Sequence, residues 1–565
     1  MKRRPLFALC LLLAASLACN ALNNFANIPG PEETATDAVG GVTASVTPLV
    51  TKTAAGTSTV GSSTATQHAS RTTQSVTATR SATAAGTPAA GTPAPTAAEQ
   101  SLLPYTLDSA ALAQAAMLPA FAGDVATLPD ASRYVIDVAI TFDGARSATL
   151  TGRELIRYTN RQTTTLPDLM LMLWPNDSDE YLGQTTLGDV TINGAPVQPQ
   201  SESKGLAARL PLSAPLAPGQ HVDLAVAFTT RADDGVQQGA RFGLTHGVLI
   251  APTFYPIIPR IVDGQWQSQW PDSANGDLSN SDTAFYAYRV TAPAGVSVAA
   301  SGVVVDQGQS GDTQSQTVLS GPMRDIALAV GDLKLAQRST TDGISVNAWT
   351  LPEHAADGPT LAQQGVDQVQ NLETRVGPYP FPQLDIVDAP GAYGGVEYPG
   401  LVYIGVVGEQ NGFEEATVHE VGHQWFYSLI GDDQLLQPWL DEAAASYTEV
   451  LYAEKVHGAQ AARQYLAYFQ SEAKSASDPN LPIGLPVDQY NGLNDYAAIV
   501  YGKGALFFDA LRTQLGDDTF FKFLHAYYQT YRYGFADSAA FEHTAEASCG
   551  CDLKPLFQKW VFGAR

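Results

Sequence analysis

The sequence predicts an α+β chain in which an all-β region, residues 103–340, precedes a mixed and increasingly helical region, residues 341–565. Two observations lead to this division. Short runs in which apolar and polar residues alternate fill the first region, separated by turn signals such as Asn193-Gly194, and such runs are typical of half-buried strands. Longer segments with helical periodicity fill the end of the second region.

The first residues are typical of a signal peptide, which we assign to residues 1–18. A positive cluster at residues 2–4 precedes an apolar run that is too short to cross a bilayer comfortably. The run ends in Ser16-Leu17-Ala18-Cys19, which resembles a bacterial lipoprotein cleavage site with Ser16 where leucine is usual. We expect export to the cell surface, with lipidation of Cys19 as a membrane anchor. Ordinary secretion and an uncleaved anchor are the alternatives.

Residues 19–102 are expected to form a disordered linker. Thr, Ser, Ala, Gly and Pro dominate, and aromatic residues are absent from residues 31–100, so this segment has no side chains from which to build a core. The full chain of 565 residues carries a formal net charge of −25. An acidic chain whose body has no basic cluster argues against nucleic acid as a partner.

The chain has four cysteines, of which Cys10 and Cys19 fall in or at the end of the leader. The other two form the pair Cys549-Gly550-Cys551. This pair predicts either a small disulfide in an oxidising compartment or two free thiols. Two cysteines alone make a poor zinc site.

The β region contains no constellation of residues that indicates catalysis. Its expected strands are, in chain order, residues 134–142, 149–158, 166–174, 221–229, 286–292, 296–305 and 325–331. The second region opens with an expected strand at 344–351, a helix at 361–376 and a strand at 384–389. It then reaches Gly394 and Gly395, which stand close to Glu397 and lead into an apolar strand. Glycines there are consistent with an exposed edge that a substrate backbone can approach, and a plain turn is the alternative.

The segment from His419 to His423 is an HExxH motif. On a helix, His419 and His423 are separated by four residues and share one face, where two neutral imidazoles can hold one Zn²⁺. Glu420 lies about 100° further round the helix. It is therefore badly placed as a ligand and well placed to take a proton from a metal-activated water.

A catalytic zinc site needs a third protein ligand and an open position. Gly431 and Pro438 punctuate the chain after the motif, and the run from Trp439 is expected to form a second helix that turns back against the first. Glu442 stands at the start of this second helix. The remaining helices are expected at residues 498–515, 518–531, 538–547 and 552–561, the first interrupted by Tyr501-Gly502-Lys503-Gly504.

Together these segments resemble the gluzincin zinc aminopeptidases, of the aminopeptidase N and leukotriene hydrolase type. The family's HExxHxWF helix matches residues 419–426, and its WLNEG segment matches residues 439–443, with Asp441 for Asn and Ala443 for Gly. Its GxMEN strand matches residues 394–398, and its YxKG segment matches residues 501–504. The resemblance implies a saddle-like β-domain followed by a thermolysin-like peptidase domain, without the large helical C-terminal domain that many members add.

The resemblance also implies a role for each matching residue. His419, His423 and Glu442 would be the metal ligands and would hold one Zn²⁺, with Glu420 as the general base. Tyr501 would stabilise the oxyanion as a second catalytic residue, and Glu397, with Gly394 and Gly395, would bind the free amino terminus of a peptide substrate. Glu449 lies seven residues after Glu442, and we expect it to orient a zinc histidine; Asp441 is the alternative for this role.

The predicted function is therefore zinc-dependent hydrolysis of peptides from the amino terminus. A zinc endopeptidase with an open cleft is one alternative, because the family's second acceptor for the substrate ammonium is not evident near Tyr255-Pro256. A catalytically silent surface protein that keeps the fold is another, although the complete set of candidate ligands speaks against it.

Overall fold

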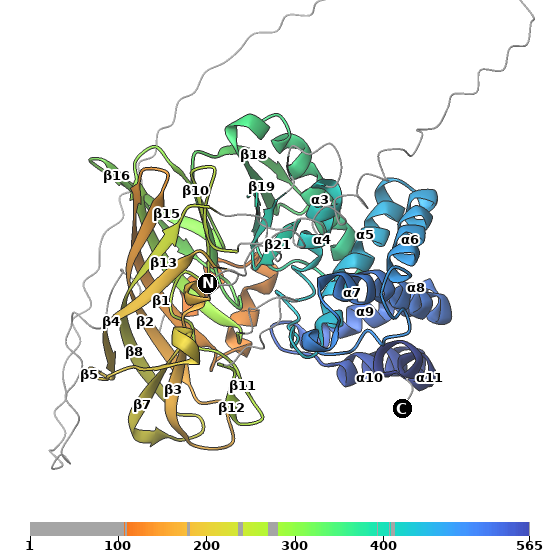
Figure 1. The fold of residues 1–565 in the computed structure, drawn as a ribbon, viewed down its shortest axis with the longest axis horizontal. Helices are drawn as coiled ribbons and strands as arrows, with labels where there is room; N and C mark the ends of the chain where they lie inside the picture. Colours follow the sequence, from red (N-terminus) through yellow and green to blue (C-terminus); the bar gives the residue numbers. More distant parts are fainter. Residues whose placement is uncertain are drawn as a thin grey trace, which may run out of the picture. The chain divides into compact units, whose positions relative to one another are not determined.

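The computed structural model describes residue 107 and residues 110–563, except residues 178–180, 236–240, 269–280, 392–393, 406 and 408–412. The predicted signal peptide, Cys19 and the predicted linker up to residue 102 lie outside the described residues. The described chain has a β-rich part (residues 110–333) and a C-terminal part (residues 334–563), which Figure 1 shows in orange to green and in green to blue. The predicted α+β fold class is confirmed.

An eight-stranded sheet forms the frame of the β-rich part, in the order β15-β16-β13-β1-β2-β8-β4-β5. Only the β1–β13 pair of this sheet is parallel among the described strands. Ile136, Val138 and Ile140 alternate on β1 and are buried, as the sequence pattern predicts. The strands are β1 (Ser132–Asp143), β2 (Ser147–Thr159), β4 (Gly183–Ile192), β5 (Ala195–Pro196), β8 (His221–Asp233), β13 (Ala284–Pro293), β15 (Val303–Ser310) and β16 (Thr313–Leu319).

Three smaller sheets complete the β-rich part, in the orders β14-β17-β10-β9, β3-β7-β6 and β11-β12. Their strands are β3 (Leu166–Met172), β6 (Gln200–Glu202), β7 (Ala207–Leu216), β9 (Gly243–Thr245), β10 (Val248–Pro252), β11 (Ile261–Val262), β12 (Gln265–Trp266), β14 (Ser297–Ala300) and β17 (Ala327–Gly331). The part is not wholly β, because the helix α2 (Ala110–Ala115) and the 3-10 helix η2 (Pro119–Thr127) precede β1. The 3-10 turns η3 (Trp174–Asn176) and η4 (Ser203–Gly205) lie between its strands.

The C-terminal part begins with a five-stranded sheet in the order β18-β19-β20-β22-β21. Its strands are β18 (Lys334–Ser339), β19 (Ser345–Thr350), β20 (Gln383–Asp388), β21 (Gly395–Tyr398) and β22 (Leu401–Ile404). The short strand β21, which carries Glu397, forms one edge of this sheet and pairs antiparallel with β22. Helix α3 (Gly358–Arg375) connects β19 to β20. It packs closely against β20 at Gly365, where a Cβ would lie 2.6 Å from the side chain of Ile386.

Helices make up the rest of the C-terminal part (Figure 1). The predicted helix over residues 498–515 is present but divided, since its first third belongs to a π-helical stretch, η8, and the rest forms α8. The helical elements after β19 and β22 are η5 (Pro352–His354), α4 (Phe413–Gly422), η6 (Pro438–Leu440), α5 (Glu442–Val456), α6 (Ala459–Ala473), η7 (Val487–Gln489), α7 (Leu493–Tyr496), η8 (Ala497–Lys503), α8 (Gly504–Leu515), α9 (Asp517–Tyr531), α10 (Ser538–Cys549), α11 (Lys554–Phe557) and η9 (Gln558–Phe562).

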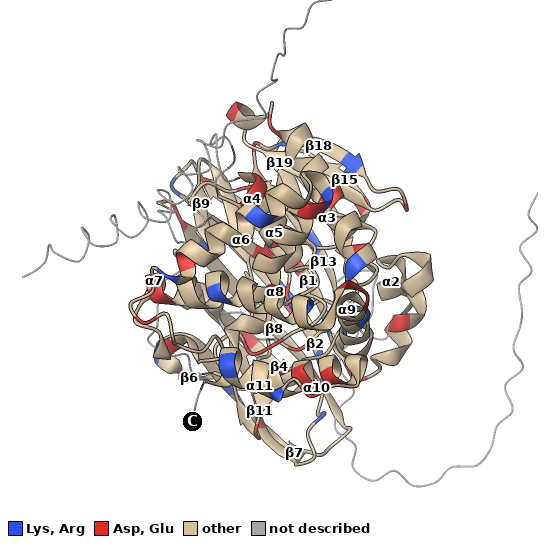
Figure 2. Cartoon of the chain, turned by 90° about the vertical axis from the view of Figure 1, so that its right-hand side faces the viewer, with Lys and Arg blue, Asp and Glu red and all other residues tan. Residues whose placement is uncertain are grey.

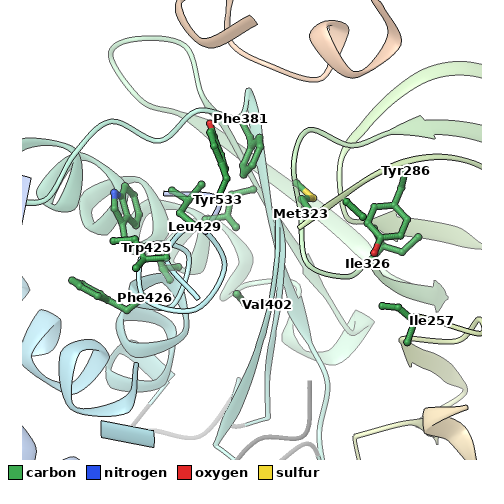
Figure 3. Close-up of a cluster of buried hydrophobic side chains, with 14 of the residues drawn as sticks. Ile257, Tyr286, Met323, Ile326, Phe381, Val402, Trp425, Phe426, Leu429 and Tyr533 are labelled. Atoms are coloured by element: carbon green, nitrogen blue, oxygen red, sulfur yellow. The ribbon is translucent and has the colours of Figure 1, made fainter. Parts of the chain in front are cut away.

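One hydrophobic core runs through both parts of the described chain. It joins Met323 and Ile326 of the β-rich part to Trp425, Phe426 and Leu429 of the C-terminal part, and Figure 3 shows these side chains. The segment after the HExxH motif therefore shares its core with residues about a hundred positions earlier in the chain, which only tertiary packing brings together.

Three further features concern the surface and the chain's surroundings. Figure 2 shows acidic and basic residues interspersed over the helices of the C-terminal part. A disulfide joins Cys549 and Cys551, which decides between the two predicted states of this pair. Among the helices that the structure describes, none combines the length and the apolar character needed to cross a membrane.

Candidate metal centre

The first two candidate ligands come from α4 and the residue that follows it. His419 lies in the last turn of α4, and His423 stands directly after Gly422, where the helix ends. The backbone N–H of His423 still donates to the carbonyl of His419 at 3.3 Å, so the helical spacing of the two imidazoles is kept. Their Nε2 atoms lie 3.1 Å apart.

Glu442, the first residue of α5, supplies the third side chain. Its Oε2 lies 3.2 Å from Nε2 of His419 and 3.3 Å from Nε2 of His423. Asp441 caps the same helix, because its side chain accepts a hydrogen bond of 2.7 Å from the backbone N–H of Glu442. This cap stabilises the start of the helix that carries Glu442.

The three side chains fit a zinc ion. Two imidazoles and one carboxylate are a typical ligand set of a catalytic zinc site. Ligand atoms at about 2.0–2.1 Å from one tetrahedral ion are about 3.3 Å from one another. The three separations here are 3.1, 3.2 and 3.3 Å. The chemistry of the donors and their spacing both suit Zn²⁺.

The charges around the centre also favour a cation. Burial by itself would lower the pKa of His423, but the carboxylates of Glu397 and Glu442 outweigh it and raise this pKa to about 10. Burial would likewise raise the pKa of Glu442, yet the hydrogen bonds from both histidines hold it well below its usual value. The surroundings thus stabilise positive charge at the point where the three side chains meet.

Each imidazole also has an acceptor on its other nitrogen. Nδ1 of His419 lies 2.9 Å from Oε1 of Glu449, and Nδ1 of His423 lies 3.1 Å from the carbonyl oxygen of Phe426. Such partners set the tautomer and the orientation of a metal-binding histidine. Of the two carboxylates considered for this position, Glu449 contacts a histidine ring and Asp441 contacts the helix start instead.

Glu420 extends from α4 toward the edge strand β21. It is buried, and a Cβ at Gly395 would lie 2.4 Å from its Cγ and from its Oε1. Gly395 is therefore required for the close approach of β21 and α4. A Cβ at Gly394 would meet no atom within 4 Å, and the carbonyl of Gly394 accepts from the N–H of Gly405 at 3.0 Å.

Glu397 projects from β21 into the same region. One ligand atom from each of Glu397, Glu420 and His423 falls in a group whose members lie within 4.8 Å of one another. The side-chain N–H₂ of Gln434 donates to Oε1 of Glu397 at 3.2 Å and to Oδ2 of Asp441 at 3.0 Å. Gln434 is not among the residues predicted from the sequence. Tertiary contacts place it between two carboxylates, and a local sequence pattern does not predict such contacts.

Tyr501 reaches the centre from the π-helical stretch η8. Its hydroxyl donates to Oε1 of Glu442, and its ring stacks on that of His419, with centroids 5.6 Å apart. A Cβ at Gly504 would lie 2.3 Å from Cβ of Ala443, so this glycine lets η8 and α8 approach α5 closely. Single π-helical stretches inside α-helices occur frequently at functional sites.

Residues 370–560, which contain every side chain described above, match the Peptidase family M1 domain. The match covers about a third of the chain. The resemblance to the gluzincin family is thereby confirmed.

Individual relatives of the M1 domain are distant. Aminopeptidase M1-A of Oryza sativa subsp. japonica is 27% identical over 255 residues, which are 42% of this chain and 29% of the relative. Aminopeptidase N of Lactobacillus helveticus is 27% identical over 262 residues, which are 42% of this chain and 30% of the relative. The match thus spans about three tenths of the length of these relatives.

Solved structures resemble this chain over both of its parts. The crystal structure of the M1 zinc metallopeptidase from Deinococcus radiodurans has a TM-score of 0.61 at 20% identity, and the comparison covers 77% of this chain and 94% of that chain. A two-domain M1 zinc metallopeptidase bound to L-arginine has a TM-score of 0.60 at 20% identity, covering 77% of this chain and 94% of that chain. At this identity the likeness establishes the fold.

Proposed function

We propose that this protein is a zinc-dependent aminopeptidase that hydrolyses peptides from their free amino terminus. The observation that carries the proposal is the closeness of Glu397 to His423 and Glu420, within 4.8 Å. The α-nitrogen and the carbonyl carbon of one residue are only about 2.5 Å apart. A peptide whose α-ammonium pairs with Glu397 therefore places its first peptide bond, and no later one, at the metal centre.

His419, His423 and Glu442 would hold the ion, which supplies an acidified water and a polarised carbonyl when it is bound. Glu420 contributes a carboxylate beside this position. It accepts the proton of the attacking water and delivers it to the departing amine, as a general base and then a general acid. The absence of a side chain at Gly395 leaves the space that this carboxylate occupies.

Tyr501 contributes the hydrogen-bond donor. Without a substrate its hydroxyl donates to Glu442, which keeps it at the metal centre. A substrate carbonyl oxygen that develops negative charge competes for this donor, and such a hydrogen bond is worth roughly 2.7–4 kcal/mol when one donor of an oxyanion site is lost.

Free and N-acetylated forms of the same peptide provide the test. The purified protein should cleave the free form and leave the acetylated form intact, and a zinc chelator should abolish cleavage. Glu397→Ala removes the partner of the ammonium, and loss of a charged hydrogen bond of about 1.5–3 kcal/mol predicts a roughly 10- to 150-fold lower kcat/KM. Equal rates on both forms would instead identify an endopeptidase.

Metal analysis tests the remaining alternative. A purified protein that contains no zinc and shows no chelator-sensitive hydrolysis would be a silent member of the fold. One equivalent of zinc per chain is the expected result.

We also propose that the protein is exported and anchored at the membrane surface through Cys19. Support comes from the signal-like residues 1–18, the long polar linker and the disulfide between Cys549 and Cys551, which is typical of an oxidising compartment. Cys19→Ala should release the protein from the membrane fraction. An unchanged distribution would favour secretion or an uncleaved anchor.

A further inference from the structure

Tyr427 has a backbone conformation that is unusual for its residue type. Its φ is +113°, in the region that favours glycine, and its side chain is buried. The residue stands four positions after His423, at the turn where the chain leaves α4. A non-glycine residue keeps such a conformation only when the surrounding structure determines it fully.

Every polar group of Tyr427 is held by a hydrogen bond. Its N–H donates to the carbonyl of Ile430 at 2.9 Å, and its carbonyl accepts from Nε of Arg324 at 2.7 Å. Its hydroxyl donates to Oδ2 of Asp325 at 2.7 Å. Two consecutive residues of the β-rich part, Arg324 and Asp325, thus hold Tyr427 from its backbone and from its side-chain end.

Arg324 is itself fixed in the protein interior. It is 1% exposed, and its guanidinium donates to the carbonyls of Gly534 and of Ser281, the latter at 3.3 Å. The guanidinium also lies 4.1 Å from the ring centroid of Phe535, and a Cβ at Gly431 would lie 2.2 Å from its Cζ. Arg324 has no room to follow Tyr427 if that residue moves.

The residues on either side of the Arg324–Asp325 pair are also buried. Figure 3 shows these two neighbours, Met323 and Ile326, in the hydrophobic core that both parts of the chain share. The segment that holds Tyr427 is therefore anchored at both of its ends.

The hydrogen bonds of Tyr427 reach His423 through one peptide group. The carbonyl of Phe426, which accepts from Nδ1 of His423 at 3.1 Å, and the N–H of Tyr427 belong to the same planar unit. Holding Tyr427 therefore sets the direction of the Phe426 carbonyl. That carbonyl sets the orientation of the His423 ring, whose Nε2 faces the centre.

We infer that Tyr427 is a positioning residue for His423, and that Arg324 and Asp325 of the β-rich part hold it in that role. The inference rests on the proposed zinc site. It means that the β-rich part contributes to metal binding through a chain of contacts, although none of its described residues supplies a ligand.

The test compares two buried tyrosines that each donate a 2.7 Å hydrogen bond from the C-terminal part to the β-rich part. Tyr427→Phe removes the bond to Asp325. The matched control, Tyr403→Phe, removes the bond from Tyr403 to the carbonyl of Leu328, and among the described residues neither of these two residues is hydrogen-bonded to His423 or to Phe426. Zinc affinity is measured by competition with a chelator of known affinity, and the absorption spectrum of the Co²⁺-substituted protein reports the ligand geometry.

Tyr427→Phe should weaken zinc binding about 3- to 30-fold, somewhat less than the roughly 10- to 100-fold effect of losing a direct partner of a ligand, and should alter the Co²⁺ spectrum. Both variants should lower the unfolding temperature by similar amounts, because each loses one buried hydrogen bond. In Tyr403→Phe, however, the zinc affinity and the Co²⁺ spectrum should stay at the wild-type values. Equal zinc affinities in both variants would overturn the inference. A wild-type protein without zinc would instead overturn the proposed function.

A second pair of variants covers the case in which Tyr427→Phe does not fold. Asp325→Asn keeps an oxygen acceptor for the phenol and should bind zinc nearly as the wild type does. Asp325→Leu removes the acceptor and should reproduce the weaker binding. Zinc affinities that do not differ between these two variants would also overturn the inference.

Discussion

His419 and Glu449 are joined by a hydrogen bond of 2.9 Å between Nδ1 and Oε1, across two different helices. Glu449 lies in the middle of α5, seven residues after Glu442, so the helix that supplies the third candidate ligand also supplies the partner of the first. The two carboxylates approach His419 from its two ring nitrogens. This arrangement ties the orientation of the imidazole to the packing of α4 against α5.

The first prediction follows from this bond. Glu449→Ala removes the acceptor of His419 Nδ1 and should weaken zinc binding about 10- to 100-fold, because the ring loses its fixed orientation. Chelator competition measures the effect. The control is Glu472→Gln, which neutralises a carboxyl on α6 that interacts electrostatically with Glu449. It should bind zinc within about twofold of the wild type, because no direct partner of a ligand is lost. If both variants lost zinc affinity to a similar degree, the weaker binding would be due to the change in charge and not to the lost hydrogen bond with His419.

Glu420→Gln should separate metal binding from turnover. The amide fills the same space against Gly395 but cannot accept a proton, so activity should fall by about 10²–10⁴-fold, the usual contribution of a general base. Zinc content should remain at the wild-type value, because Glu420 is not among the three side chains that meet at the centre. Retained turnover would refute the assignment of the base.

Tyr501→Phe should lower kcat by about 10²–10³-fold with little change in KM, because the donor is needed where charge develops on the carbonyl oxygen. The stacked contact with His419 survives this change. Steady-state kinetics on a free peptide provides the measurement. A raised KM at an unchanged kcat would place Tyr501 in substrate binding.

Gln434→Leu should weaken recognition of the free amino terminus. The change removes the donor that Glu397 shares with Asp441, and loss of one such hydrogen bond, about 1–2 kcal/mol, predicts a roughly 5- to 30-fold lower kcat/KM on free peptides. Gln437→Leu is the control, because Gln437 lies on the same loop and accepts hydrogen bonds from Ser538 instead. Equal effects in the two variants would mean that the loop as a whole is disturbed.

Glu154 predicts a pH dependence of stability. It is 0% exposed on β2, neither of its carboxyl oxygens has a hydrogen-bond partner among the described residues, and burial raises its pKa well above the usual value. The unfolded chain loses this proton at lower pH than the folded chain does. The contribution of Glu154 to stability is therefore complete below the usual carboxyl pKa of about 4.3 and declines as the pH rises above it.

Glu154→Met and Glu154→Gln both remove the titrating group. Each should show a smaller fall in unfolding free energy than the wild type between about pH 5.5 and pH 8.5. Glu154→Met should in addition be more stable at about pH 8.5 by about 1–3 kcal/mol, because it removes an unsatisfied polar group from the core. Urea unfolding at the two pH values measures this. Parallel changes in all three proteins would exclude Glu154 as the source.

Local sequence patterns predicted the elements of this fold better than their pairing. The strands of the β-rich part alternate apolar and polar residues, which is a property of a few neighbouring positions. The parallel pairing of β1 with β13 joins Ser132 to Ala284, and no local pattern specifies a partner so distant in the chain. The helices α2 and η2 were missed for a related reason, because they are short and their stability comes from packing.

The sequence by itself determined the chemistry that is carried by close neighbours in the chain. The geometry of one helix determines the relative positions of His419, Glu420 and His423. Glu442 and Glu449 lie on a second helix, and Pro438 and Trp439 just before it indicate where it begins. Only the tertiary structure decided which distant groups act on these residues. The Gln434 amide between two carboxylates and the Arg324–Asp325 pair around Tyr427 are brought there by packing of segments far apart in the chain. Such contacts depend on the whole folded core, so periodicity and motif spacing do not reveal them.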